Sequence, residues 1–209
     1  MPLMSFIKNL YFKSNSERYV KHLRRHGVII GKNVKFLSPR SNVVDLTRPY
    51  LISIGDNVRI THGVILLTHG YDWFVLHNAY DRKFGSAGKL DIGNNVFIGM
   101  NSILLKGITI GSNVVIAAGS IVTKDIPDNT VVAGNPARVI SSLDDYLKKI
   151  IDRQIVEAKN DISAFLKRYG RLPSMNEIKE FTYLYEKSEN DCSKFDTYDD
   201  FLNKINLNI

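Results

Sequence analysis

Large apolar residues recur at every sixth position over much of this 209-residue chain, and this period constrains the fold more than any other feature. A small or β-branched residue stands four positions after most of them, and Asn or Gly often precedes that residue. Six residues are too few for a helical repeat, but they fit a short strand and a tight corner. The positions in phase are Ile30, Phe36, Ile54, Ile60, Leu66, Ile92, Ile98, Leu104, Ile110, Ile116 and Val122.

Three such units make one turn of a triangular coil, in which the large apolar residues point inward and stack from turn to turn. Asn and Gly suit the corners because they tolerate a positive φ. A sandwich of short strands would instead show turn signals about every 8–12 residues, and the long run of positions in phase argues against it. We therefore expect an all-β solenoid, a parallel β-helix, over residues 28–140.

The segments on either side of the repeat have helical spacing. Residues 5–26 read as helix, so residues 1–27 are expected to form an N-terminal helical segment. Residues 126–140 contain two prolines and should end the coil, since a solenoid must cap its open end. Residues 141–209 are expected to form a C-terminal helical extension, with helix over 142–168, a capping box at Ser174 and Glu177, and a short helix after Thr197 or Asp199.

The formal net charge is +7, and most of the excess lies at the N-terminal end, where residues 1–40 hold nine Lys and Arg against the single acid Glu17. Such a segment suits either an anionic membrane surface or a solvated helix face. No zinc-finger spacing or other signal favours nucleic acid. No apolar run has the roughly 18 residues of a membrane-spanning helix, the N-terminus is a poor secretory signal, and the only cysteine is Cys192. These features predict a cytoplasmic protein.

Two motifs resemble a known family. The stretch IGNNVFIGMNSILLKGITIGSNVVIAAGSIVTKDIPDNTVVAGNPARVI, residues 92–140, closely resembles the closing turns of hexapeptide-repeat acetyltransferases. THGYDW, residues 68–73, is most similar to the branch that O-acetylates sugars in capsular, lipopolysaccharide and exopolysaccharide synthesis. The resemblance covers roughly residues 28–140. It implies a left-handed β-helix, acetyl-CoA as co-substrate without a metal, a saccharide acceptor, and a homotrimer with active sites between subunits.

The long interruption of the repeat begins at His69, where this family carries its catalytic histidine. A sugar hydroxyl is a weak nucleophile and needs a base to take its proton as it attacks a thioester. We expect His69 to take that proton and to return it to the leaving thiolate of coenzyme A, without an acyl-enzyme. A structural corner residue is the alternative, and His62 is the main rival. The sequence leaves open which group orients the ring: Asp72 is close in the chain, and a backbone carbonyl would serve as well.

The interruption itself, at about residues 70–91, is expected to project from the coil as a loop and to help form the acceptor pocket, because a long loop in a compact domain is usually functional. Its aromatic side chains suit stacking on a sugar face, and its polar side chains suit hydrogen bonds to hydroxyls. One further carboxylate, in the irregular segment VVDLTRP, is expected to face the acceptor as well. The predicted acceptor residues are Asp45, Tyr71, Asp72, Trp73 and His77.

The resemblance implies that the pantetheine arm of acetyl-CoA runs beside the later turns of the coil. Small side chains would allow its close approach, and cations suit the phosphates at its other end. The chain has no phosphate-cradling GxxxxGK[ST] motif, which argues against a nucleoside triphosphate enzyme. Met100, Ala117 and Ala118 are expected to line the arm, and Thr123, Lys124 and Arg138 to meet the nucleotide phosphates.

Three other functions stay open. The same chemistry would serve an antibiotic hydroxyl or an amino sugar as acceptor. The γ-type carbonic anhydrases share the fold, but they need three histidines around zinc, and no histidine follows His77. A non-catalytic β-helix scaffold would bind no coenzyme A.

Overall fold

The structure is a computed structural model that describes residues 11–184 and 195–205, without the side chains of Thr182 and Tyr183. Cys192 and residues 5–10 of the predicted N-terminal helix lie outside this range. Backbone contacts divide the chain into two compact units, Met1–Tyr146 and Leu147–Ile209. The finer division predicted above, into residues 1–27, 28–140 and 141–209, stays a prediction.

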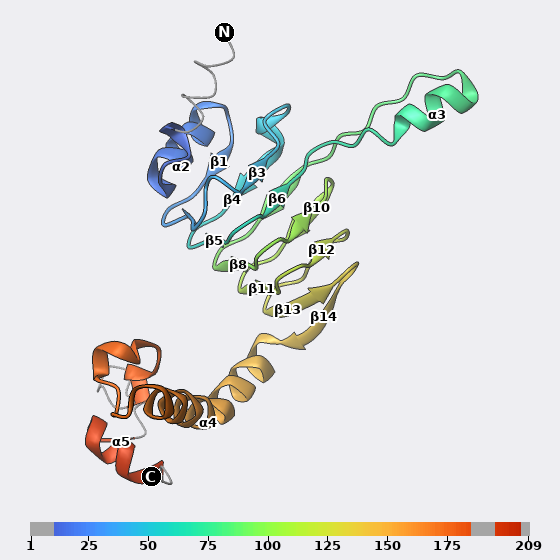
Figure 1. The fold of residues 1–209 in the computed structure, drawn as a ribbon. Coiled ribbons are helices and arrows are strands. Elements are labelled where there is room, and N and C mark those ends of the chain that lie inside the picture. The colour runs from blue at the N-terminus through green and yellow to red at the C-terminus, as the bar shows by residue number, and fades with distance from the viewer. Residues whose placement is uncertain (1–10, 185–194, 206–209) are drawn as a thin grey trace. The chain divides into compact units, whose positions relative to one another are not determined.

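From β1 to β12 the first unit passes through three sheets in rotation (Figure 1). Each strand from β4 to β12 lies parallel to the strand three before it in the chain, which is the arrangement that a repeat of one strand and one corner requires. Sheet A holds β1 (Ile29–Ile30), β4 (Ile52–Ile54), β7 (Leu90–Ile92) and β10 (Ile108–Ile110). Sheet B holds β2 (Lys35–Phe36), β5 (Arg59–Ile60), β8 (Val96–Ile98), β11 (Val114–Ile116), β13 (Thr130–Gly134) and β14 (Ala137–Ser142). Sheet C holds β3 (Val43–Val44), β6 (Ile65–Leu66), β9 (Ile103–Leu104) and β12 (Ile121–Val122).

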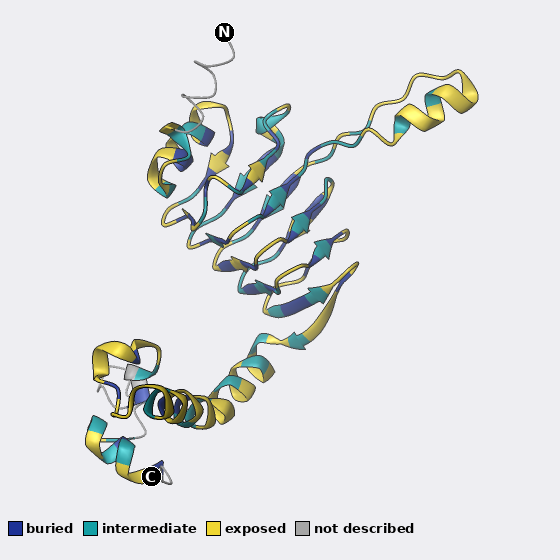
Figure 2. Cartoon of the chain, in the orientation of Figure 1, coloured by how far each residue is buried: buried dark blue, intermediate teal, exposed yellow. Residues whose placement is uncertain are grey.

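The core of this unit consists of the residues predicted from the six-residue period. Every position in phase from Ile30 to Val122 is buried. The strand pairing places equivalent positions of neighbouring turns side by side, as where Leu66 pairs with Leu104. The strands therefore alternate between buried and more exposed residues, as Figure 2 shows. Each fully buried aliphatic side chain contributes about 2 kcal/mol of hydrophobic stabilisation, so this column accounts for much of the driving force for folding.

Asparagine side chains form a ladder along the corner between sheets A and B. Asn33, Asn57, Asn95, Asn113 and Asn129 all have φ between 53° and 59°, which confirms the predicted use of Asn at corners. The side-chain amide of Asn33 donates to Oδ1 of Asn57 at 2.8 Å, and the side-chain amide of Asn113 donates to Oδ1 of Asn129 at 2.9 Å. These bonds satisfy polar groups that the tight corners would otherwise leave without protein partners.

Helix α2 (Ser16–Arg25) packs onto the beginning of the coil and buries Tyr19, Val20 and Leu23 in the same core. The prediction of one helix over residues 5–26 was wrong in its described part. Asn15 has an extended backbone, and its side chain accepts a hydrogen bond from the amide of Arg18 at 2.9 Å, so a new helix begins there.

The coil ends within residues 126–140, as predicted from the two prolines of that segment. Strand β13 still pairs parallel with β11, but β14 folds back antiparallel onto β13. Beyond it, α4 (Leu143–Tyr169) leads into the second unit, which has its own core of Ala158, Ile162, Ile178, Leu184, Phe201 and Ile205.

The second unit contains short helical elements besides α4. These are the 3₁₀ turns η2 (Met175–Glu177) and η3 (Lys179–Leu184) and the helix α5 (Tyr198–Lys204), and a further 3₁₀ turn, η1 (Pro49–Leu51), lies in the first unit. The predicted capping box of Ser174 and Glu177 is present, but it begins η2 rather than an α-helix. Thr197 caps α5 as predicted. Within the described residues, none of the helices is both long and apolar enough to cross a membrane.

The interruption of the repeat is an arm, residues 70–87, that leaves the coil after β6 and projects from it, as predicted (Figure 1). At its base the amide of Gly88 donates to the carbonyl of Thr68 at 2.9 Å. A Cβ at Gly88 would stand 2.6 Å from the amide nitrogen of Gly107, so the arm rejoins the coil through a contact that only glycine allows. The arm also contains a helix that was not predicted, α3 (Trp73–Tyr80), none of whose residues is buried.

Candidate active site

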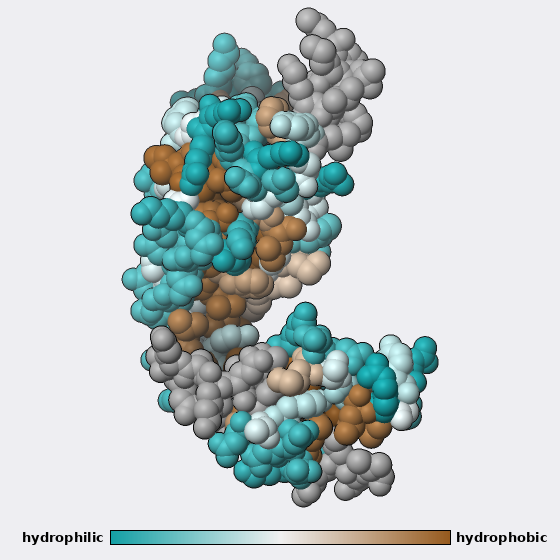
Figure 3. Space-filling model, turned by 90° about the vertical axis from the view of Figure 1, so that its left-hand side faces the viewer, coloured by the Kyte–Doolittle hydropathy of each residue, from teal (hydrophilic) through white to brown (hydrophobic). Residues whose placement is uncertain are grey.

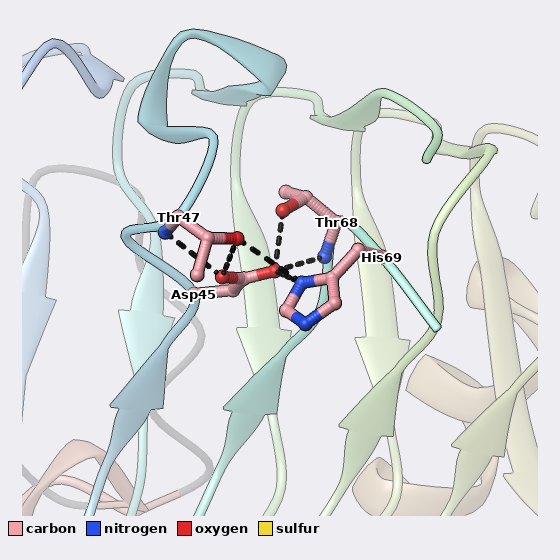
Figure 4. A network of polar contacts seen from close by, with 4 residues as sticks. All are labelled: Asp45, Thr47, Thr68 and His69. Carbon is pink, nitrogen blue, oxygen red and sulfur yellow. Dashed lines mark hydrogen bonds and ion pairs between the residues drawn. The ribbon is translucent and has the colours of Figure 1, made fainter. Parts of the chain in front are cut away.

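Four polar residues meet at one end of sheet C (Figure 4). Strands β3 and β6 are neighbours in this sheet, with Val44 paired to Leu66. The residues that directly follow the two strands therefore reach the same edge of the sheet. Asp45 and Thr47 come from the chain after β3, and Thr68 and His69 come from the chain after β6.

The carboxylate of Asp45 accepts hydrogen bonds from five donors. Oδ1 accepts the amide of Thr47 at 3.0 Å and its hydroxyl at 2.7 Å. Oδ2 accepts the amide of Thr68 at 3.0 Å, the hydroxyl of Thr68, and Nδ1 of His69. A carboxylate has roughly four lone-pair positions, so these donors use the whole acceptor capacity of Asp45.

Asp45 stays ionised although it lies inside the protein, with only 4 % of its side chain exposed. Burial raises the pKa of this carboxyl, but the hydrogen bonds from Thr68 and Thr47 outweigh burial and hold the pKa well below its usual value. At neutral pH the group is therefore an anion that only accepts hydrogen bonds.

The ionised carboxylate fixes the tautomer of His69. Because Oδ2 of Asp45 can only accept, Nδ1 of His69 must carry the hydrogen. Oγ1 of Thr47 lies 3.1 Å from the same nitrogen and gives its own hydrogen to Asp45, so it too can only accept there. A neutral ring then has its lone pair on Nε2, which lies on the side of the ring away from the carboxylate (Figure 4). This is the arrangement of a general base held by a buried acid.

The structure shows contacts of Asp45 that the sequence analysis did not predict. Its oxygens accept hydrogen bonds from Thr47, Thr68 and His69, so it lies against the histidine, and its contact with an acceptor stays a prediction. Asp72, one of the groups left open for orienting the ring, directly precedes α3 in the arm. The pairing of Val44 with Leu66 places Asp45 beside the residues that follow β6, and this register appears only in the structure, because the six-residue phase is lost between Phe36 and Ile54.

The arm brings one predicted acceptor residue to the histidine. The ring of Tyr71 stands edge-on to that of His69, with centroids 4.7 Å apart and an interplanar angle of 82°. Trp73 follows, 6.0 Å from Tyr71 between ring centroids. His77 lies within α3, where its Nδ1 donates to the carbonyl of Arg82 at 2.9 Å and so contributes to the fold of the arm itself.

The residues predicted to bind the acyl donor divide between the two ends of the sheet C strands. Met100 and Ala118 stand at the corner where these strands begin, and the amide of Gly119 donates to the carbonyl of Met100 at 2.7 Å. His62 occupies the same corner in the preceding turn, and its carbonyl accepts the amide of Asn101 at 2.9 Å. Its side chain is exposed.

The other predicted donor residues are placed as follows. Thr123 and Lys124 follow β12 at the edge that holds His69, and both are exposed. Ala117 is half-buried, and its carbonyl accepts the hydroxyls of Ser102 and Ser120. Arg138 lies exposed in β14. A single chain therefore does not bring the whole predicted donor set to His69.

Lys106 is a candidate active-site residue that the sequence analysis did not predict. It follows β9 at the same edge, and its Cε lies 3.5 Å from the point where a Cβ on Gly70 would stand. Its place in the repeat, the same as that of Lys124 one turn later, was the available signal. Within residues 11–184 and 195–205, no three His, Cys, Asp or Glu side chains form a group that could hold a metal ion.

Comparison with known proteins identifies the family. A family model described as the hexapeptide repeat of succinyl-transferase matches residues 89–124. Protein CapG of Staphylococcus aureus is 48% identical to this chain over 130 residues, which are 62% of this chain and 74% of CapG. The chain belongs to the hexapeptide-repeat acetyltransferases. Galactoside O-acetyltransferase of Escherichia coli K12, another relative of this acetyltransferase, is 48% identical over 98 residues, 46% of each chain.

Among solved structures, a hexapeptide-repeat acetyltransferase from Vibrio cholerae, complexed with acetyl coenzyme A, is similar to this chain. The identity is 30% with a TM-score of 0.41, and the similarity covers 56% of this chain and 61% of that one. Of the two relatives described first, the chain spans about three quarters of the length of CapG and about half of the length of the galactoside enzyme. The predicted family and the prediction of an acyltransferase are confirmed.

Proposed function

We propose that this acetyltransferase transfers the acetyl group of acetyl-CoA to a sugar hydroxyl of a surface polysaccharide or its precursor. Family membership supports acetyl transfer, and a relative named galactoside O-acetyltransferase supports a saccharide acceptor. The observation that carries the proposal is the contact of His69 Nδ1 with the buried carboxylate of Asp45, which leaves Nε2 as a base.

In the proposed reaction, Nε2 of His69 takes the hydroxyl proton while the hydroxyl oxygen attacks the thioester carbonyl. As the tetrahedral intermediate collapses, the carbon–sulfur bond breaks, and the imidazolium returns the proton to the leaving thiolate. The products are an acetyl ester and free coenzyme A. Asp45 stabilises the imidazolium that exists between the two proton transfers, and general base catalysis of this kind contributes about 10²–10⁴-fold in rate.

Tyr71 and Trp73 are proposed to form the platform for the saccharide. Tyr71 is 67% exposed and touches the ring of His69, so a sugar stacked on it would present hydroxyls beside Nε2. Asp72 and His77 lie further along the arm and stay proposals as acceptor ligands. An amino sugar or an antibiotic alcohol would use the same base and remains the alternative acceptor.

We also propose that the enzyme is a homotrimer of left-handed coils in which two subunits complete each site. The outer face of sheet C carries a column of apolar side chains. In each strand of this sheet, the first residue faces outward, and the second residue is more deeply buried in the core. A second copy that covered this face would bring the Met100 corner of one subunit towards the His69 edge of another. The column consists of Val43, Ile65, Ile103 and Ile121, which pair in register.

Attachment to an anionic membrane through α2 is a further proposal. The exposed side of this helix carries Arg18, Lys21 and Arg25. Lys32 and Lys35 lie exposed on the adjoining turn of the coil. On the face seen in Figure 3, hydrophilic side chains gather at the level of this helix. Lipid-linked glycan precursors lie at such surfaces, so this location suits the proposed acceptor.

The test is thiol release from acetyl-CoA in the presence of galactosides, nucleotide sugars, amino sugars and antibiotic alcohols. Thiol release that depends on a sugar hydroxyl supports the proposal. Thiol release only with an amino sugar or an antibiotic alcohol would favour the alternative acceptors instead. No binding of acetyl-CoA by calorimetry, together with no release, would instead indicate the non-catalytic scaffold.

A further inference from the structure

The hydroxyl of Thr68 differs from the other buried hydroxyls of the coil. Those of Thr61, Ser102 and Ser120 donate to backbone carbonyls, and so they satisfy the main chain of the solenoid. Thr68 is fully buried, but its hydroxyl donates to Oδ2 of Asp45, the oxygen that also meets His69.

We propose that Thr68 is a positioning residue for the transfer reaction, whose hydroxyl fixes the carboxylate of Asp45 so that Oδ2 meets Nδ1 of His69. The proposal rests on the function proposed above for His69. Thr68 acts through Asp45 and touches neither substrate in that mechanism.

The geometry supports this role because the two threonines hold the carboxylate at both ends. Thr47 donates its amide and its hydroxyl to Oδ1, and Thr68 donates its amide and its hydroxyl to Oδ2. A carboxylate held by two donors at each oxygen cannot rotate about its Cβ–Cγ bond without breaking several hydrogen bonds at once. Oδ2 is therefore kept in place for His69.

The hydroxyl also supports the charge of Asp45. It is the largest favourable contribution to the low pKa of this carboxyl and opposes the effect of burial. Without it, the carboxylate would be less strongly stabilised and more readily protonated, and a protonated Asp45 would no longer require hydrogen on Nδ1 of His69. The hydroxyl of Thr68 thus affects Nδ1 of His69 in two ways, through the position of the Asp45 carboxylate and through its charge.

The experiment compares Thr68→Val, which removes the hydroxyl and keeps the branched shape, with Thr68→Ser, which keeps the hydroxyl. Thr61→Val is the matched control, because it removes a buried hydroxyl that bonds a backbone carbonyl. We expect Thr68→Val to lower kcat by about tenfold or more, since a hydrogen bond to a charged group is lost, with little change in KM for acetyl-CoA. Thr68→Ser should recover most of kcat, and Thr61→Val should leave kcat of the folded enzyme unchanged.

A second readout does not depend on turnover. In enzyme labelled with ¹⁵N-histidine, the ring nitrogens of His69 should report hydrogen on Nδ1 at neutral pH. Thr68→Val should shift these signals, whereas Thr61→Val should not. In an Asp45→Asn background, Thr68→Val should cost much less in kcat than it does in the wild type, because the carboxylate it serves is gone.

Folded Thr68→Val with wild-type kcat and unchanged His69 signals would overturn the proposal. Equal losses in Thr68→Val and Thr68→Ser would also overturn it, since they would indicate packing rather than the hydroxyl. Wild-type activity in His69→Ala would refute the proposed function instead, while the spectra would still show whether Thr68 positions the pair.

Discussion

The carboxylate of Asp45 bonds Nδ1 of His69 across the ends of two neighbouring strands, although the two residues are 24 positions apart in the sequence. The solenoid makes this contact because one turn of the coil places β3 beside β6. A rigid ladder of paired strands thus fixes a carboxylate and an imidazole at one edge, where the coil opens into the arm.

The stability of the protein should depend on pH through Asp45. Its pKa in the folded protein lies below the value of about 3.9 expected in the unfolded chain. The ionised carboxylate therefore contributes stability that is fully present above the unfolded pKa and is lost as the pH falls through the folded pKa. We expect the difference in unfolding free energy between wild type and Asp45→Asn to be largest near neutral pH and to shrink below about pH 4. Urea unfolding between pH 7 and pH 3 measures it, and a difference that stayed constant would contradict the assignment.

Tyr71 should matter for the acceptor and not for the donor. Tyr71→Ala removes the ring that stands against His69, so we expect KM for the saccharide to rise by about tenfold, as the loss of one aromatic contact predicts. KM for acetyl-CoA should stay the same. Phe74→Ala is the control, because Phe74 is a similarly exposed aromatic residue of the same arm. Equal effects of the two substitutions would argue against a specific platform at Tyr71.

The apolar face of sheet C should hold the subunits together. Ile65→Asp places a charge in the middle of that face, and we expect the trimer to dissociate and turnover to fall, because burying an unpaired charge is costly. Ile29→Asp is the control, since Ile29 is 66% exposed on sheet A. Light scattering after size exclusion reports the mass, and a wild-type protein of about 24 kDa in solution would refute the trimer.

Binding to anionic vesicles should depend on α2. We expect the protein to sediment with phosphatidylglycerol vesicles at low salt, to be released at high salt, and to ignore phosphatidylcholine vesicles. Lys21→Glu with Arg25→Glu should abolish sedimentation, whereas Lys167→Glu with Arg168→Glu, at the end of α4, should not. A wild-type protein that stays in the supernatant would dismiss this proposal without affecting the catalytic one.

The six-residue period predicted most of the coil because each turn repeats one physical demand, a buried apolar side chain followed by a corner. It could not predict Asp45 as the partner of His69, because the phase is lost between Phe36 and Ile54 and the register of β3 is set only by pairing. The helix α3 was missed for a different reason. It buries no residue, so its sequence carries no amphipathic pattern.

Local chemistry also overrode the predicted N-terminal helix, which Asn15 interrupts by capping α2. Most of the predicted donor residues lie at two different corners of one chain, and their role in binding acetyl-CoA stays a prediction. Periodicity within a chain does not report how copies of that chain meet, so the sequence could not show which corner faces His69.

The most direct test of the account is kcat for acetyl transfer by His69→Ala and Asp45→Asn beside the wild type. We predict that both variants fold, that His69→Ala loses at least about a hundredfold in kcat as a missing general base requires, and that Asp45→Asn also loses kcat with little change in KM for acetyl-CoA. Wild-type kcat in folded His69→Ala would contradict the central claim that His69, held by Asp45, is the base.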